Sequence, residues 1–142
     1  MPIPTPEPGL VISYAYLWGH EAQRGQEEGR KDRPCVIALA VERQPDGDML
    51  VTVLPVTHRS PTEAGAAVEI PSAIKRHLGL DDARSWIVVS EGDRFVWPGY
   101  DLRKVPGSDF YDYGFLPPRF FQEVLAAFRT WHRQRRTGVT VR

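Results

Sequence analysis

The chain has 142 residues, which is enough for one well-packed domain and too few to expect two. Hydrophobic residues make up 42% and charged residues 25% of the sequence, values that exclude a disordered or fibrous protein. The 18 basic and 18 acidic residues balance, so no whole-molecule field attracts nucleic acid and any basic site must be local. The single cysteine, Cys35, lies in an apolar run and is expected to be a buried, unreactive thiol.

Residues 1–8 carry proline at every second position, a pattern that predicts an extended arm outside the core. This start lacks the basic and then apolar regions of a signal peptide. The apolar run at residues 35–41 is too short to span a membrane. We therefore expect a cytoplasmic protein with no membrane partner.

The strongest strand candidate is residues 35–41, because a continuous apolar run of this length between polar residues is typical of a sheet-core strand. Residues 10–18 are a second candidate, since they are rich in aliphatic and aromatic side chains. Pro34 suits the start of its strand, where a missing N–H is tolerated. Arg33 then lies just outside the sheet, with its guanidinium free for a ligand. The alternative is an ordinary ion pair with a loop carboxylate, from Glu27, Glu28 or Asp32.

The pair Asp46-Gly47 predicts a reversing turn after the strand at 35–41, and residues 49–56 return as its antiparallel partner. In such a hairpin, the residues before the first strand lie beside the residues after the second. The hairpin therefore predicts that Arg33 and Thr57 come together.

The remaining elements have weaker signals. Pro55 predicts that the second strand of the hairpin leaves the ladder at that residue. A tight turn is expected at Glu91-Gly92, and residues 100–115 are given no element. Further predicted elements are a strand at 66–70, a short helix at 71–79 with proline first and glycine last, and strands at 85–90 and 93–97.

Residues 117–136 predict an amphipathic helix docked on a sheet, because apolar side chains recur at steps of three and four. The apolar stripe consists of Phe121, Val124, Leu125, Phe128 and Trp131. Residues 129–142 contain five arginines and a histidine without an acidic residue. Two explanations of this basic segment stay open: it binds RNA phosphates, or it only stabilises the negative end of the helix dipole.

Several kinds of site have no signal in the sequence. The four histidines are scattered and no cysteine pair exists, so neither a metal nor a cofactor is expected. The glycines fit no phosphate-binding loop, and no serine lies in a Gly-x-Ser-x-Gly motif. Residues 19–32 form a polar loop of mixed charge, which is either a solvated connection or part of a site. The strand ends at Arg33 and Thr57 remain as the functional candidate.

Several segments, in their order and spacing, resemble the PemK/MazF family of toxin endoribonucleases. They are Gly9-Leu10-Val11-Ile12, a charged loop with Glu28 five residues before Arg33-Pro34, then Val36-Ile37-Ala38-Leu39, and Val53-Leu54-Pro55-Val56-Thr57. Glu69-Ile70-Pro71 and Trp86-Ile87-Val88-Val89-Ser90-Glu91 resemble the family's later strands. The resemblance covers roughly residues 9–97, and the C-terminal helix continues it.

The resemblance implies an α+β, mostly β fold: a small SH3-like barrel with a short helix and an amphipathic C-terminal helix. The barrel domain would span residues 9–136, with a basic tail at 137–142. The implied function is that of a toxin in a toxin–antitoxin system, which cleaves single-stranded mRNA without a metal and inhibits growth. Such toxins are usually homodimers and are silenced by a cognate antitoxin protein.

The resemblance carries over two catalytic residues: Arg33 matches the arginine of the family's Arg-Pro motif, and Thr57 the hydroxyl residue of its Pro-x-Thr motif. Attack by a ribose 2′-hydroxyl develops negative charge on the phosphate, which a guanidinium and a hydroxyl can stabilise or protonate. We expect Arg33 to stabilise the phosphate and donate a proton, because arginine is a poor base. His58 is our hypothesis for the base near neutral pH, and Glu28 is a further catalytic or substrate-binding candidate. The RNA-binding candidates are Arg24, Arg30, Lys31 and Arg59.

Two other functions stay open. A barrel of this type with little or no catalytic activity would only bind nucleic acid or an antitoxin. An SH3-like protein-interaction module would instead line a peptide groove with Trp18, Trp86 and Trp97, although tryptophans in a small barrel more often pack in the core.

Overall fold

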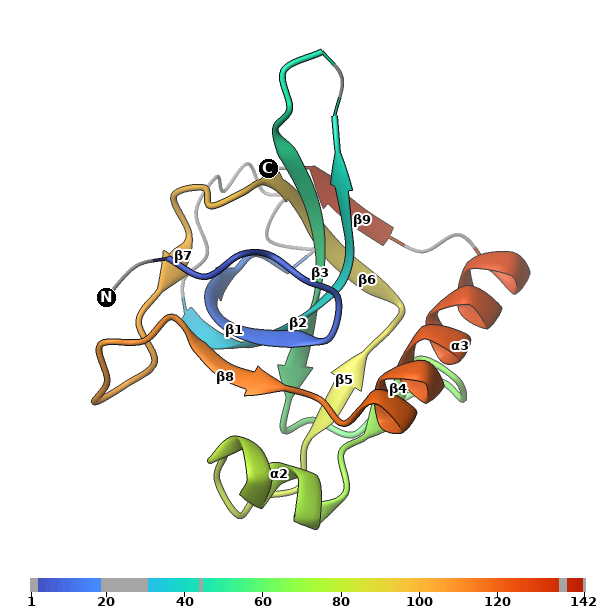
Figure 1. The fold of residues 1–142 in the computed structure, drawn as a ribbon. Coiled ribbons are helices and arrows are strands. Elements are labelled where there is room, and N and C mark those ends of the chain that lie inside the picture. The colour runs from blue at the N-terminus through green and yellow to red at the C-terminus, as the bar shows by residue number, and fades with distance from the viewer. Residues whose placement is uncertain (1–2, 19–30, 44, 136–137, 142) are drawn as a thin grey trace.

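The computed structural model describes residues 3–18, 31–43, 45–135 and 138–141. Its centre is a strongly curled, mainly antiparallel sheet that forms a half-barrel, with two helices beside it (Figure 1). The strands are β1 Leu10–Tyr16, β2 Lys31–Glu42, β3 Met49–Thr57, β4 Ala67–Glu69, β5 Trp86–Val88, β6 Glu91–Val96, β7 Leu102–Arg103, β8 Asp112–Phe115 and β9 Gly138–Val141. The predicted α+β, mostly β fold class is therefore confirmed.

The β2–β3 hairpin is the framework of the sheet, and it confirms the predicted pairing. Its strands pair antiparallel from Cys35 opposite Pro55 to Glu42 opposite Met49, and a positive φ of 76° at Gly47 allows the turn. The prediction that Pro55 ends the strand is wrong, because the ladder includes this residue and β3 continues to Thr57. Residues of an antiparallel strand alternate in their bonds to one neighbour, so a single missing N–H interrupts the ladder only locally.

Both predicted helices are present. Helix α2, Ser72–Leu78, begins after Pro71 and ends at Gly79, whose φ of 72° provides a left-handed C-cap. Helix α3, Pro118–Gln134, begins after Pro117 and ends two residues before its predicted limit. None of the helices in the described part of the chain is long and apolar enough to cross a membrane.

The two faces of the central strands bury two separate apolar clusters. The helix-side cluster lies between the sheet and the helices and includes Val11, Val36, Leu54, Ile87 and Val124. The inner cluster lies on the opposite face of the same strands, where Tyr14 of β1 stacks on Phe95 of β6 at 4.8 Å between ring centroids. Its members are Leu10, Ile12, Tyr14, Tyr16, Cys35, Ile37, Val51, Val53 and Phe95. Burial on both faces explains why β1 and residues 35–38 of β2 have continuous apolar sequences without alternation.

Three segments differ from their predicted structure. Glu91 and Gly92 begin β6 and do not form a turn, and residues 100–115, which were given no element, supply β7 and β8 on the β1 side of the sheet. The four residues of β9, assigned to a basic tail from sequence, pair in parallel with β6. The N-terminal arm lies against the sheet, because the carbonyl oxygen of Pro4 accepts a hydrogen bond from Trp97 Nε1 at 3.1 Å.

The Cys35 thiol is fully buried in the inner cluster, as the sequence predicted. Burial, with the negative charge of Asp93 adding to it, raises the pKa of this thiol well above its ordinary value. We expect no labelling of the folded protein by a thiol reagent at pH 8, and rapid labelling once denaturant unfolds the chain. Labelling of the native protein at the rate of a free cysteine would contradict the burial of this strand.

Candidate functional site

The register of the hairpin brings the two principal candidate residues together. Cys35 lies opposite Pro55, so two residues further along the same antiparallel register Arg33 lies opposite Thr57. A direct contact supports this placement, because Arg33 Nη1 donates a hydrogen bond to the carbonyl oxygen of Val56 at 3.3 Å. The structure therefore brings together the two residues that the predicted hairpin paired. The prediction that Arg33 lies just outside the sheet is wrong, because Arg33 is part of β2 and lies opposite Tyr14 of β1.

A pocket of about 570 Å³ lies at these strand ends. Its wall combines two arginines, several hydroxyl side chains, one carboxylate and a tryptophan. These come from the segment after β1, the ends of β2 and β3, the loop after β3, and parts of β4, β5 and β6. The lining residues are Trp18, Arg33, Thr57, Arg59, Ser60, Pro61, Thr62, Ala66, Ala67, Val88, Ser90 and Glu91. Such a wall suits an anionic ligand that also carries hydroxyl or amide groups.

Arg33 is held in place but keeps an unused donor. Its guanidinium carbon lies 4.9 Å from the centroid of the Trp18 ring, and Val56 accepts from one terminal nitrogen. The Nε atom is buried and has no hydrogen-bond partner in the described part of the chain. Asp32, the neighbouring carboxylate weighed as an alternative partner, pairs with Arg103 at 3.7 Å. Because Nε has almost no exposed surface, an anion in the pocket would be bound by the terminal nitrogens of the guanidinium.

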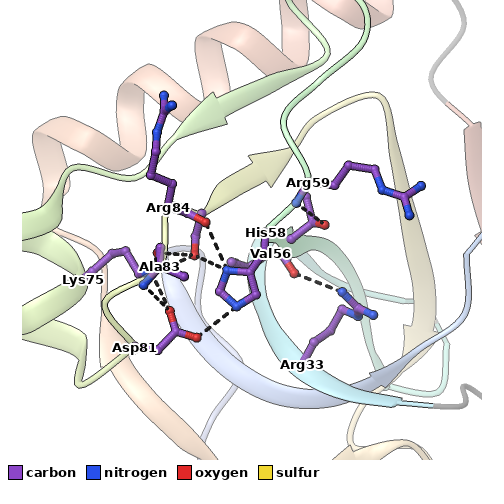
Figure 2. A network of polar contacts seen from close by, with 10 residues as sticks. Arg33, Val56, His58, Arg59, Lys75, Asp81, Ala83 and Arg84 are labelled. Carbon is purple, nitrogen blue, oxygen red and sulfur yellow. Dashed lines mark hydrogen bonds and ion pairs between the residues drawn. The ribbon is translucent and has the colours of Figure 1, made fainter.

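Thr57 and Arg59 form the opposite wall. The Thr57 hydroxyl oxygen accepts a hydrogen bond from the backbone N–H of Arg59 at 3.2 Å, which closes a short turn at the end of β3. The Thr57 hydroxyl hydrogen is not consumed by this bond. Figure 2 shows the Arg59 side chain extending away from His58, and Arg59 lines the pocket. Two cationic side chains therefore flank one hydroxyl.

Glu91 is a pocket residue that the sequence analysis assigned to a turn. Its Oε2 accepts a hydrogen bond from the hydroxyl of Tyr16 at 2.8 Å. Burial, followed by the charges of Glu91 and Asp93, raises the pKa of Tyr16 far above its ordinary value, so this phenol stays a donor at any physiological pH. The sequence signal that could have placed Glu91 in a strand is the alternation of Glu91, Asp93 and Phe95. In a strand this spacing puts all three side chains on the face of the inner cluster.

His58 lies outside the pocket lining, although it is adjacent in sequence to Thr57. Figure 2 shows its ring turned toward the connection between α2 and β5. Nε2 lies 2.9 Å from Asp81 Oδ2, and Nδ1 lies 3.0 Å from the carbonyl oxygen of Arg84 and 3.2 Å from Ser85 Oγ. His58 lies in the bend after β3, where its ring contacts the connection between α2 and β5 and not the pocket.

Lys75 is the centre of the network that holds His58. The residue is 4% exposed, and its ammonium donates to Asp81 Oδ1 at 2.7 Å, to Ser85 Oγ at 2.8 Å and to the carbonyl oxygen of Ala83. All three ammonium hydrogens therefore have acceptors, which is how a buried lysine is tolerated. Ser85 is itself buried and is committed to Lys75 and Ala83, so the His58, Asp81 and Ser85 grouping is structural and not a hydrolase triad.

Other predicted candidates receive no side-chain placement. Glu28, Arg24 and Arg30 lie outside the described residues, and Lys31 begins β2 with only its backbone described. Of the tryptophans expected to line a peptide groove, Trp86 is only 8% exposed, and Trp97 donates its indole N–H to Pro4 of the N-terminal arm. In the part of the chain that the structure describes, no group of three or more His, Cys, Asp or Glu side chains could hold a metal ion.

The sequence matches no protein-family model and no curated protein. Any function therefore has to be argued from the pocket and from the sequence motifs that form it.

Proposed function

We propose that this protein is an endoribonuclease that cleaves single-stranded RNA at the Arg33–Thr57 pocket without a metal ion. The observation that carries the proposal is that Arg33, Thr57 and Arg59 line one pocket, which places two guanidinium groups and a hydroxyl in the same wall. A phosphodiester provides the two things that this wall binds, namely a negative charge and oxygen acceptors.

The proposed reaction is transesterification within the RNA. The ribose 2′-oxygen attacks the adjacent phosphorus, the bond from phosphorus to the 5′-oxygen breaks, and the products are a 2′,3′-cyclic phosphate and a 5′-hydroxyl. Arg33 and Thr57 would donate hydrogen bonds to the phosphoryl oxygens as negative charge develops. Glu91 is the carboxylate in the pocket wall and would accept the 2′-hydroxyl proton, while a water molecule would give a proton to the departing 5′-oxygen.

The finer fold assignment belongs to the same proposal. A small SH3-like barrel of the PemK/MazF type is supported by the curled sheet, by the β2–β3 hairpin and by the Arg-Pro and Pro-x-Thr motifs at its ends. The corresponding biological role is a growth-inhibiting, cytoplasmic toxin that acts as a homodimer and is neutralised by an antitoxin protein. Expression of the chain in growing cells, followed by RNA sequencing to locate the cut sites, tests that role.

A second candidate function is binding of RNA or an antitoxin without cleavage. The position of His58 favours it, because the side chain hypothesised as the base has both ring nitrogens engaged outside the pocket. The two functions differ in one measurement, since a binding protein retains a labelled RNA intact whereas an endoribonuclease shortens it.

Replacing Thr57 by valine keeps a β-branched side chain but removes the hydroxyl donor. We expect RNA cleavage to slow by about 10- to 100-fold, the effect of losing one hydrogen bond to a charged group. Thr57→Ser is the matched control and should retain most of the activity. Equal cleavage rates for wild type and Thr57→Val, measured on a fluorescent single-stranded RNA, would exclude a role for this hydroxyl.

A further inference from the structure

We propose that the C-terminal end of α3 positions the pocket loop for RNA binding, with Trp131 and Arg135 as positioning residues. The pocket loop is residues 58–66, which join β3 to β4. The members of this loop that line the pocket are Arg59, Ser60, Pro61, Thr62 and Ala66. The inference rests on the proposed function for the ligand, but the effect of α3 on the loop can be measured without RNA.

The middle of the pocket loop is a tight turn. The backbone N–H of Ala66 donates a hydrogen bond to the carbonyl oxygen of Glu63 at 3.2 Å, and Gly65 has a φ of 84°. A positive φ at the third residue of a four-residue turn defines the type II geometry, which favours glycine there. Residues 59–62 before the turn and Ala66 after it line the pocket, whereas residues 63–65 do not.

Two contacts hold this turn against the end of α3, and together they are called the loop brace below. Glu63 Oε2 lies 3.1 Å from Arg135 Nε. A Cβ atom at Gly65 would lie 3.8 Å from Trp131 Cε3, so the backbone of the turn lies close to the indole ring. Figure 1 shows β4, which follows the pocket loop, beside α3. The pocket loop is therefore supported by the helix on the side away from the pocket.

Arg135 is itself fixed on the helix. Its guanidinium carbon lies 4.3 Å from the centroid of the Trp131 ring, and its backbone N–H donates to the Trp131 carbonyl oxygen at 2.7 Å. Trp131 is 7% exposed and belongs to the helix-side cluster. A side chain that is already held in place loses little further entropy when it pairs with Glu63. The ion pair therefore ties the pocket loop to the packed core.

The loop brace provides a third explanation of the basic segment at residues 129–142. The Arg135 guanidinium is paired with a carboxylate, so part of its charge is compensated before any phosphate approaches. Arg135 then acts on RNA through the pocket loop, by keeping Arg59 and the neighbouring hydroxyl side chains in place. A pocket wall that is already ordered loses less conformational entropy when a ligand binds.

Glu63→Gln separates positioning from direct binding of RNA by Arg135. If Arg135 binds a phosphate, removing its competing carboxylate should tighten RNA binding, whereas losing the loop brace should weaken it. We expect about two- to fivefold weaker binding in Glu63→Gln and in Arg135→Gln, the effect of one exposed ion pair. The double variant should bind no more weakly than either single variant, because both substitutions remove the same contact.

The measurement is fluorescence anisotropy, over a range of salt concentrations, with a labelled single-stranded RNA whose 2′-hydroxyls are methylated so that it cannot be cleaved. Glu123→Gln is the matched control, because this exposed glutamate of α3 carries the same charge outside the loop brace. Loss of a direct phosphate contact would reduce the slope of log affinity against log salt by about 0.7, whereas loss of positioning leaves that slope unchanged. A reduced slope in Arg135→Gln, or binding by Glu63→Gln that equals or exceeds that of Glu123→Gln, would overturn the proposal.

NMR relaxation of the backbone amides, without RNA, distinguishes a failure of the loop brace from a failure of the proposed function. The N–H groups of Arg59 and Ala66 are both hydrogen-bonded within this region and report its order. We expect their order parameters to fall from about 0.85 toward 0.6 in Glu63→Gln and Arg135→Gln, while Val53 in β3 stays unchanged. Unchanged values at Arg59 and Ala66 would overturn the loop brace. A fall at both amides, combined with no RNA binding by the wild type, would show that α3 orders the pocket loop and would refute the proposed RNA site.

Discussion

Replacing Arg33 by lysine should slow RNA cleavage by about 100-fold or more, although the positive charge is kept. The ammonium of lysine has no planar face to lie against Trp18. It cannot present two fixed donors to a phosphate while also donating to Val56. The expected loss should appear mainly in kcat, because the missing hydrogen bonds strengthen as charge develops.

Arg43→Lys is the matched control for this substitution. Arg43 follows β2 at its other end, where it pairs with Asp48 at 3.4 Å on the exposed hairpin. We expect this variant to cleave at the wild-type rate. Circular dichroism and a melting curve should show that both variants are folded. Wild-type activity in folded Arg33→Lys would rule out the guanidinium as the catalytic group.

Replacing Leu54 by alanine should lower the free energy of unfolding by about 3 kcal/mol. Leu54 is fully buried in the helix-side cluster on the central strand β3, and it packs close to Gly92 of β6. The neighbours cannot fully collapse into the vacated space, because β3 is paired with β2 on one side and β6 on the other, which fixes the backbone around Leu54. Urea unfolding measures the loss, and the melting temperature should fall by about 10 °C.

Leu39→Ala provides the comparison for the core substitution. Leu39 lies on the adjacent strand β2 but is 41% exposed, so the same change removes little buried surface. We expect it to cost less than about 1 kcal/mol. Equal costs at the two positions would contradict the assignment of Leu54 to the helix-side cluster.

Local sequence signals predicted the elements that have a clear periodicity of apolar residues or are bounded by proline and glycine. The proline before α2 and the left-handed glycine after it gave the limits of that helix to within one residue. The stripe at steps of three and four predicted α3, in which Val124 is fully buried. The Asp46-Gly47 turn predicted the hairpin and, through it, the proximity of Arg33 and Thr57.

Long-range pairing explains what the sequence left undetermined. Strands β7 and β8 are short and exist because β1 offers them an edge, so no local signal marks residues 100–115. Strand β9 likewise depends on pairing with β6 and was assigned to a tail. A lysine in a short helix is expected to be exposed, yet Lys75 of α2 is buried because Asp81 and Ser85 accept hydrogen bonds from its ammonium. Glu91 joins the pocket only through the register of β6.

The most direct test of the proposed activity is incubation of the purified protein with a mixed-sequence single-stranded RNA in excess chelator. The proposal predicts fragments that end in 2′,3′-cyclic phosphate and begin with 5′-hydroxyl, and their disappearance in Arg33→Lys and Thr57→Val. An RNA that stays intact with folded wild-type protein would contradict the endoribonuclease proposal. Cleavage that persists in both variants would contradict the assignment of the pocket as its active site.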